Sequence, residues 1–197
     1  MKLKHSILIC LVSLLLQACG PTAHTLSGLG YVWRPQKLTR SANDRVKDGY
    51  WDRPAGLTGE HMIVIDTAQQ KATYLINGRY VGHSSISSGK AGHTTPSGTF
   101  TILAKDINHR SSTYGSIVDE RGNTLIADYT VGQPRPKNGI YKGAEMNYGM
   151  QITRTGIWMH EGAVTSAPES HGCIRLPKKM AAIFFENTPV GAKVIIK

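Results

Sequence analysis

Short runs of β-branched and aromatic residues, separated by turn formers, constrain the fold of this chain more than any other feature of its sequence. Three such runs occupy residues 61–67, 71–76 and 79–87, and only Asn77-Gly78 separates the last two. Asn-Gly between two such runs is the strongest short hairpin signal, because both central residues of a type I′ turn need a positive φ. We therefore predict three consecutive strands, the last two of them joined as a β-hairpin.

A long polar excursion follows these strands. Residues 89–98 predict a loop, and residues 99–105 predict the next strand. Residues 106–149 are polar and rich in Gly, Pro and Tyr, so we predict a long loop excursion with one weak strand at 124–130. We expect the tyrosines of this excursion to pack under the loop rather than to line a substrate groove; they are Tyr114, Tyr129, Tyr141 and Tyr148.

One helix is expected near the C-terminus. Pro177 opens residues 178–188, whose apolar positions recur at helical spacing. One or two strands are expected at 151–160, and a last strand at 190–197. The predicted fold class is mainly β, a sandwich or barrel with one C-terminal helix and a long loop excursion.

The composition of the 197 residues excludes two classes of protein. Hydrophobic residues make up 40% and charged residues 18%, with 21 glycines. These values lie in the globular range, so neither a largely disordered chain nor a polytopic membrane protein is expected. The net charge of +10 allows nucleic acid, a membrane surface or an acidic substrate as a partner, and the compartment decides between them.

The N-terminus carries the pattern of an export signal. Lysines precede an apolar run over residues 7–16, which is too short for a comfortable membrane span. Residues 16–19, Leu-Gln-Ala-Cys, resemble the lipobox of bacterial lipoproteins. This resemblance implies a signal peptide at 1–18, lipid on the Cys19 thiol and, because Gly20 follows, a periplasmic location on the outer membrane. An uncleaved anchor and a plain signal peptide cut elsewhere are the alternatives, and each of them exports the chain.

Turn formers without a sustained apolar period fill the segment after the lipobox. We predict that residues 19–58 form a lipidated tether and that residues 59–197 form the folded domain. Four aromatic residues argue instead that parts of the tether lie against the domain; they are Tyr31, Trp33, Tyr50 and Trp51.

Export leaves a single free thiol. Cys10 leaves with the signal peptide and Cys19 becomes a thioether, so Cys173 stands alone in a compartment where disulfides form. Removal of Lys2 and Lys4 lowers the net charge to +8, which is 21 minus 13. Nucleic acid is then not an expected partner. An anionic cell wall and simple solubility remain as two interpretations of the charge.

The densest chemical signal surrounds this thiol, where residues 170–175 read SHGCIR. A cysteine acts as a nucleophile when its thiolate is accessible and stabilised by a histidine or by positive charge, and His171 and Arg175 lie two residues to either side of Cys173. The N–H groups of Gly172 and Cys173 are candidate oxyanion donors. A buried structural thiol is the alternative. A His/Cys metal site is not expected, because the chain has no CxxC or HxxxH set.

Residues 170–175 follow a histidine within residues 158–162, WMHEG, and these motifs resemble the signature of the L,D-transpeptidase catalytic (YkuD-type) domain family. Residues 63–100 also resemble the opening of that family, a strand and a hairpin followed by a loop that contains glycine and proline. The resemblance covers residues 61–197 and implies a mainly β, sandwich-like fold, in agreement with the strand pattern.

The resemblance implies a role for each motif position. Cys173 matches the nucleophile and His160 the general base. Four residues match the remaining positions, which serve the substrate or the oxyanion: Ser170, His171, Gly172 and Arg175. The chain departs from the family at Glu161, where glycine is frequent, and only nine residues separate the first histidine from the SHGC segment. These departures leave open what orients the base.

Local geometry and the family motif disagree about which histidine is the base. In an extended segment the side chains of residues i and i+2 share a face, which favours His171 as the partner of Cys173. The family motif favours His160, which we follow, and His171 then shapes the pocket or supports the oxyanion. The imidazole would take the thiol proton, and its cation would hold the sulfur as a thiolate at neutral pH. Arg175 suits either a stem-peptide carboxylate or a structural ion pair.

The implied activity is that of a lipid-anchored, periplasmic L,D-transpeptidase acting on peptidoglycan stem peptides. Cys173 would form an acyl-enzyme with a tetrapeptide stem and pass it to an amine, giving a 3–3 cross-link without a metal or an organic cofactor. The resemblance also implies inhibition by carbapenems. The alternatives are an L,D-carboxypeptidase or hydrolase that uses water, transfer to a lipoprotein acceptor, and a non-catalytic wall-binding lipoprotein.

Other polar residues carry weaker signals. His83, His93 and His109 are expected at the surface or in hydrogen bonds, although His93 lies in the family-like loop and could wall the pocket. Arg135 and Lys137 are expected in a solvated turn.

Overall fold

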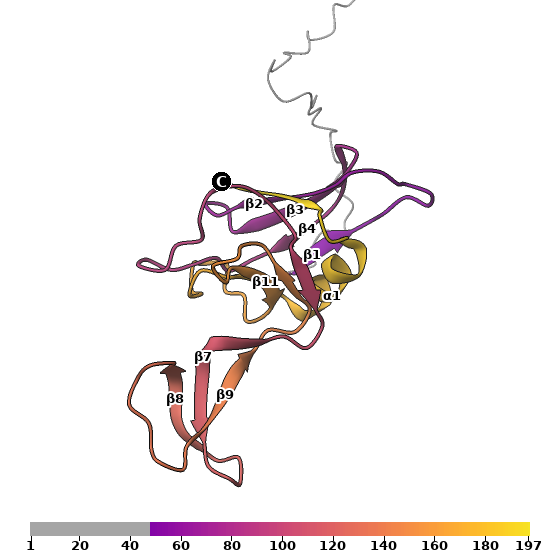
Figure 1. Ribbon diagram of the computed structural model, residues 1–197. Coiled ribbons are helices and arrows are strands. Elements are labelled where there is room, and N and C mark those ends of the chain that lie inside the picture. Colours follow the sequence, from indigo (N-terminus) through magenta and orange to yellow (C-terminus); the bar gives the residue numbers. More distant parts are fainter. Residues whose placement is uncertain (1–47) are drawn as a thin grey trace, which may run out of the picture. The chain divides into compact units, whose positions relative to one another are not determined.

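The computed structural model describes residues 48–197, which form thirteen strands and one helix (Figure 1). In chain order the elements are β1 (Gly49–Trp51), β2 (His61–Asp66), β3 (Lys71–Ile76), β4 (Arg79–Ser85), β5 (Gly98–Thr101), β6 (Ala104–Asp106), β7 (Arg110–Val118), β8 (Thr124–Thr130), β9 (Ile140–Glu145), β10 (Gly149–Gln151), β11 (Trp158–Glu161), β12 (Ile174–Leu176), α1 (Lys178–Asn187) and β13 (Lys193–Ile196). This architecture confirms the predicted mainly β fold with one helix near the C-terminus.

The Asn77-Gly78 turn joins β3 and β4 as the sequence predicts. Both turn residues have a positive φ, 48° and 71°, and Ile76 pairs with Arg79 across the turn. The hairpin lies within a six-stranded sheet of order β1-β4-β3-β2-β13-β5. The last strand of the chain, β13, inserts parallel to β2 and thereby completes this sheet.

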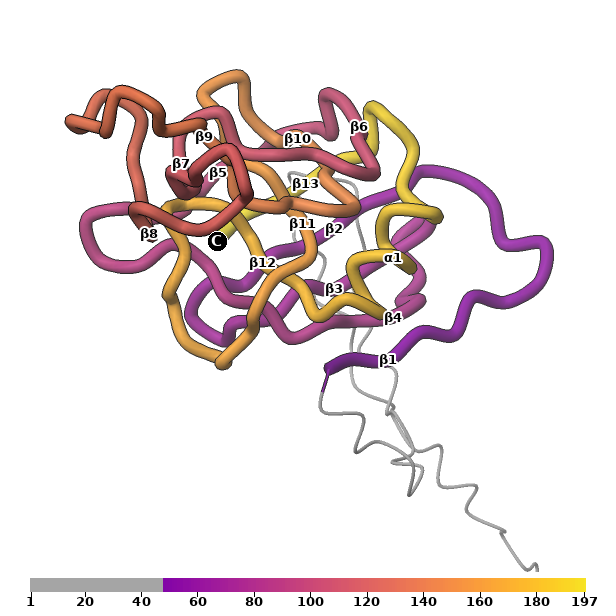
Figure 2. Tube along the Cα trace, turned by 90° about the horizontal axis from the view of Figure 1, so that it is seen from below, coloured from indigo at the N-terminus to yellow at the C-terminus, as the bar shows by residue number. Residues whose placement is uncertain are grey.

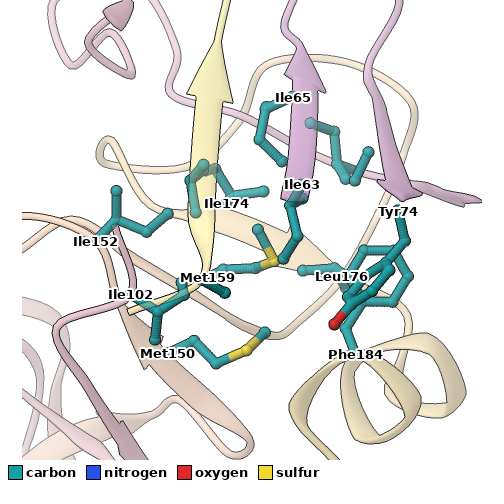
Figure 3. Packing of buried hydrophobic residues seen from close by; sticks show 14 of the residues in the cluster. Ile63, Ile65, Tyr74, Ile102, Met150, Ile152, Met159, Ile174, Leu176 and Phe184 are labelled. Atoms are coloured by element: carbon teal, nitrogen blue, oxygen red, sulfur yellow. The ribbon is translucent and has the colours of Figure 1, made fainter. Parts of the chain in front are cut away.

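A second sheet packs against the first and creates the sandwich. Its order is β12-β11-β10-β6, and only β11 and β12 are parallel within it. The core between the sheets is made of fully buried side chains (Figure 3); they include Ile63, Ile65 and Tyr74 from the first sheet and Met150, Met159, Ile174 and Leu176 from the second. Complete burial of such an apolar side chain contributes roughly 1.5–3 kcal/mol to folding.

The helix α1 closes one side of this core. Pro177 is its N-cap residue, and Met180 and Phe184 bury the apolar face that the sequence predicts. At the other end, the Lys105 ammonium donates hydrogen bonds to the carbonyls of Phe185 and Thr188, 2.5 and 2.8 Å away, which satisfies the end of the helix. Across residues 48–197, no helix has the length and the apolar character that a membrane span requires.

Strand β1 comes from the C-terminal part of the predicted tether. It pairs with β4 at the edge of the first sheet, and the Trp51 ring packs against Tyr74 and Phe184 at centroid distances of 4.9 and 5.8 Å. The aromatic residues at 50 and 51 therefore lie against the domain, as the alternative interpretation of this segment expects. The rest of the predicted tether before residue 48, with Cys19, Tyr31 and Trp33, lies outside the described residues.

The strand predicted at 99–105 is two strands that belong to different sheets. β5 ends at Thr101 and β6 begins at Ala104. Between them, the Ile102 N–H donates to the Ala192 carbonyl and the Leu103 N–H donates to the Gln151 carbonyl. The chain therefore changes sheets at this point, and the continuous apolar pattern of the sequence conceals the crossing.

The excursion predicted as a long loop is a three-stranded antiparallel sheet of order β8-β7-β9. Only its predicted strand, at 124–130, is confirmed, as β8. The prediction of a loop is wrong because this sheet buries few apolar side chains, among them Ile117, so its sequence lacks a clear alternation. The expected packing of tyrosines is found at Tyr129, which is buried, and at Tyr141, whose hydroxyl donates to the carbonyls of Ser111 and Tyr114. The expectation that these tyrosines do not line a groove is wrong for Tyr114 and Tyr129, which both line a cavity.

Candidate active site

Two parallel strands bring the predicted nucleophile and base to the same part of the second sheet. β11 and β12 lie side by side (Figure 2), with His160 in register with Arg175. Cys173 directly precedes β12, and its thiol donates a long hydrogen bond to the Gly156 carbonyl, with 3.7 Å between the sulfur and the oxygen. The backbone N–H of Trp158, the first residue of β11, also acts on this sulfur and lowers its pKa. The thiol therefore lies beside the first residue of β11, and His160 follows two residues later on that strand.

A backbone carbonyl orients His160. The ring is buried, and its Nδ1 lies 2.6 Å from the carbonyl oxygen of Glu161. Because a carbonyl only accepts, Nδ1 carries the hydrogen and Nε2 of the neutral ring is left as the basic nitrogen. This hydrogen bond comes from the main chain, so the departure from the family's glycine at position 161 does not remove the group that orients the base.

Burial keeps both members of the pair neutral. It lowers the pKa of His160 to about 4; the Glu161 carbonyl opposes this effect, and the positive charge of Arg175 adds to it. Burial also raises the pKa of Cys173, against the opposing effects of the Trp158 N–H and of Arg175. The prediction of a thiolate at neutral pH is therefore wrong for the resting site, which holds a neutral thiol and a neutral imidazole.

The turn that carries Cys173 is fixed by Ser170 and Gly172. The buried Ser170 hydroxyl donates to the Cys173 carbonyl at 2.5 Å and accepts the Gly172 N–H at 3.1 Å. Gly172 has a φ of +109°, which residues with a Cβ rarely adopt. Its N–H is already engaged in this turn, so of the two predicted oxyanion donors only the N–H of Cys173 is kept in our interpretation.

The glycine-rich loop at 89–98 forms hydrogen bonds with the turn that carries Cys173. Gly89 forms a bridge with Ser170, and the Lys90 N–H donates to the Ser170 carbonyl at 3.0 Å. The Thr95 hydroxyl donates to the Gly172 carbonyl at 2.8 Å. The two motifs that carry the family resemblance are therefore in direct contact.

His171 packs against two rings, whereas His160 is held by a backbone carbonyl. The His171 ring stacks on Tyr114 at a centroid distance of 4.4 Å and meets the edge of His93 at 4.8 Å. Tyr114 belongs to β7, so this histidine joins the SHGCIR segment to the three-stranded sheet. The ring contact places His93 next to His171, but His93 is not among the residues that line the cavity beside Arg175, so the expectation that it walls the pocket is not met there.

Arg175 borders a cavity of about 520 Å³. Its aliphatic stem packs against Gly162, where an added Cβ would meet it at 2.9 Å. Arg175 has no ion-pair partner among residues 48–197, so the alternative role in a structural ion pair finds no support in that part of the chain.

Two further residues lie at this site: Trp158, the first residue of the WMHEG segment, and His109, which lies outside both motifs. The His109 ring stacks on Trp158 at a centroid distance of 3.8 Å, and its Nδ1 lies 3.2 Å from the Asp106 carboxylate. His109 therefore makes the hydrogen bond expected of it, and its charge also lowers the pKa of His160. Trp158 could have been found, because residues i and i+2 of a strand share a face; the contact of His109 spans distant parts of the sequence.

The fold and the site together define a class of protein: a mainly β domain with a cysteine and a histidine on neighbouring parallel strands. The family model described as the L,D-transpeptidase catalytic domain (YkuD) matches residues 60–196. The chain therefore belongs to the L,D-transpeptidase catalytic domain family, as its motifs predict.

Individual relatives agree with this family. The chain is 27% identical over 167 residues to L,D-transpeptidase 1 of Mycobacterium tuberculosis, a match that covers 81% of this chain and 59% of the relative's length. Among solved structures, an L,D-transpeptidase from Mycobacterium smegmatis superimposes with a TM-score of 0.53 at 28% identity, covering 70% of this chain and 58% of that one. An L,D-transpeptidase in complex with imipenem has a TM-score of 0.52 at 24% identity, with the same coverages of 70% and 58%, a similarity of fold alone.

Proposed function

We propose that this protein is a peptidoglycan L,D-transpeptidase that forms an acyl-enzyme on Cys173 and transfers the acyl group to an amine. The observation that carries the proposal is the hydrogen bond of 2.6 Å between His160 Nδ1 and the Glu161 carbonyl, because it leaves Nε2 as a base on the strand beside the thiol. A partly exposed sulfur and an oriented neutral imidazole are the two groups that cysteine acyl transfer requires.

The first half-reaction is acylation of Cys173. The sulfur attacks the carbonyl of the L-centre at stem position three as its proton passes to His160 Nε2. The new C–S bond forms, the C–N bond to D-alanine breaks, and the proton on His160 moves to the departing amine. The Cys173 N–H would stabilise the oxyanion, and Arg175 would bind a carboxylate of the stem.

The second half-reaction is transfer to the acceptor. A neutral amine, the side-chain amine of a second stem's diamino acid, attacks the thioester carbonyl; the C–N bond forms and the C–S bond breaks. The proton released by the amine passes through His160 to the sulfur, which restores the thiol. The neutral resting pair fits this scheme, because a general base takes the proton only as the sulfur attacks.

Product analysis tests this proposal. We expect that purified sacculi incubated with the protein will yield dimers joined by 3–3 cross-links. Tripeptide monomers without dimers would instead identify the hydrolase that uses water as acceptor, and a stem joined to a lipoprotein would identify that acceptor. Wall binding without any change in the stems would contradict both enzymatic functions and favour a non-catalytic binding protein.

We also propose that Cys19 carries the lipid of an outer-membrane lipoprotein, on the strength of the Leu-Gln-Ala-Cys sequence at 16–19. Cells fed labelled palmitate should incorporate the label into the unaltered chain but not into the Cys19→Ser variant. The variant should also leave the membrane fraction. Equal labelling of the two chains would contradict lipidation at Cys19.

A further inference from the structure

The cavity beside the nucleophile is larger than the proposed chemistry alone requires. It has a volume of about 520 Å³ and is lined by His171 and Arg175 together with residues of β7, β8 and β9. These two motif residues lie two positions before and after Cys173, and Arg175 is in register with His160, so the cavity is next to the segments that carry the nucleophile and the base, although neither Cys173 nor His160 lines it. The scheme above uses only Arg175 from this lining.

Some charged residues of the cavity lining form ion pairs with one another, and those that do not are mostly positive. Arg110 and Glu145 form an ion pair, with 2.6 Å between the guanidinium and the carboxylate. Among residues 48–197, neither Lys142, Arg175 nor Asp128 takes part in an ion pair. Asp128 is therefore the one carboxylate of this lining that is left for a ligand.

Asp128 lines the same cavity as His171 and Arg175. Burial and the charges of Lys90, His93 and Arg175 lower the pKa of His171, and the negative charge of Asp128 opposes them. The backbone of Asp128 has a φ of +52°, a left-handed conformation that Asp and Asn adopt more readily than other residues with a Cβ. This conformation occurs within β8, where the register of its pairing with β7 shifts, and Asp128 is one of the residues that line the cavity.

A transpeptidase acceptor has a specific requirement at this place. A primary amine is an ammonium ion at neutral pH, and the positive charges of Lys142 and Arg175 repel it while they attract stem carboxylates. We infer that Asp128 binds the ammonium group of the acceptor amine and thereby selects an amine over water. This inference rests on the proposed function and concerns its second half-reaction.

Asp128 acts before the bond-making step. It holds the ammonium group at the cavity until one proton is lost to water, and the resulting neutral amine then attacks the thioester as described above. Acylation of Cys173 needs no amine, so it is independent of Asp128. The two half-reactions can therefore be measured separately.

The test compares the Asp128→Asn and Glu120→Gln variants with the unaltered full chain. Asn keeps the left-handed backbone and removes only the charge, while Glu120 is an exposed acid in the turn between β7 and β8, outside the cavity lining. With a disaccharide-tetrapeptide as donor and acceptor, Asp128→Asn should lower the ratio of cross-linked dimer to tripeptide by up to about fivefold, the upper end of the range for one exposed charge pair. The rate of Cys173 acylation by imipenem should stay unchanged, and Glu120→Gln should alter neither value.

Salt and charge reversal sharpen this test. The effect of Asp128→Asn should shrink as the ionic strength rises, because screening weakens an exposed pair, and Asp128→Lys should lower the ratio further. An unchanged ratio in an Asp128→Asn chain that still acylates overturns the inference. Failure of the unaltered chain to acylate is a different result, since it overturns the proposed function itself.

Discussion

Replacement of Cys173 with alanine is expected to abolish turnover of stem peptides and to remove the covalent adduct with imipenem. The thiol supplies the only nucleophile in the proposed scheme, and the resemblance of its motif to the L,D-transpeptidase family implies reaction with carbapenems such as imipenem. Intact-mass measurement after incubation with imipenem checks the adduct, and product analysis with the disaccharide-tetrapeptide checks turnover.

The fold of the Cys173→Ala variant should be retained, which separates a chemical loss from a structural one. The sulfur is partly exposed, and the turn is held mainly by hydrogen bonds of Ser170 and Gly172 rather than by the thiol. Circular dichroism and binding to sacculi should therefore match those of the unaltered chain. A persistent imipenem adduct, or undiminished cellular function, would contradict the role of Cys173 as nucleophile and favour the wall-binding alternative.

The sequence predicts the first sheet well because its signals are local. The turn at Asn77-Gly78 fixes the register of β3 and β4, and the β-branched run at 61–67 contains β2, in which Ile63 and Ile65 are buried. The β7–β8–β9 sheet could not be predicted in the same way. Its strands pair with one another with irregular register and bury little apolar surface, so their residues resemble those of a loop.

The candidate site shows a similar division. The motif identifies Cys173 and His160, and parallel pairing of β11 and β12 brings their strands together. The group that orients His160 is a backbone carbonyl, which every residue type possesses and no motif records. The protonation states of Cys173 and His160 depend on burial, which only the folded core creates. No local sequence pattern could therefore show that the expected thiolate is wrong.

Replacement of His160 with glutamine is expected to slow acylation of Cys173 by about 10²–10⁴-fold, the usual contribution of a general base. In the unaltered chain the acylation rate should fall as the pH is lowered through about 4 rather than through 6.5; this fall is the acid limb of the pH profile. The reason is that burial lowers the pKa of His160 to about 4 and keeps Nε2 unprotonated above that value. The rate of imipenem adduct formation between pH 3 and 8 measures both effects, and the variant should lose this limb.

Two histidine variants decide whether the limb belongs to His160. His83→Gln, in the first sheet, should leave the limb in place. His171→Gln should lower the rate without removing the limb, whereas loss of the limb in that variant alone would make His171 the base.

The lowered pKa of His160 also affects stability. The unfolded chain binds a proton on this histidine near pH 6.5, whereas the folded chain binds it only near pH 4. The free energy of unfolding should therefore fall as the pH drops through this interval. In His160→Gln this part of the decline should be absent, which urea titrations at pH 7 and pH 4.5 would detect; an equal decline in both chains would contradict a buried neutral imidazole at this site.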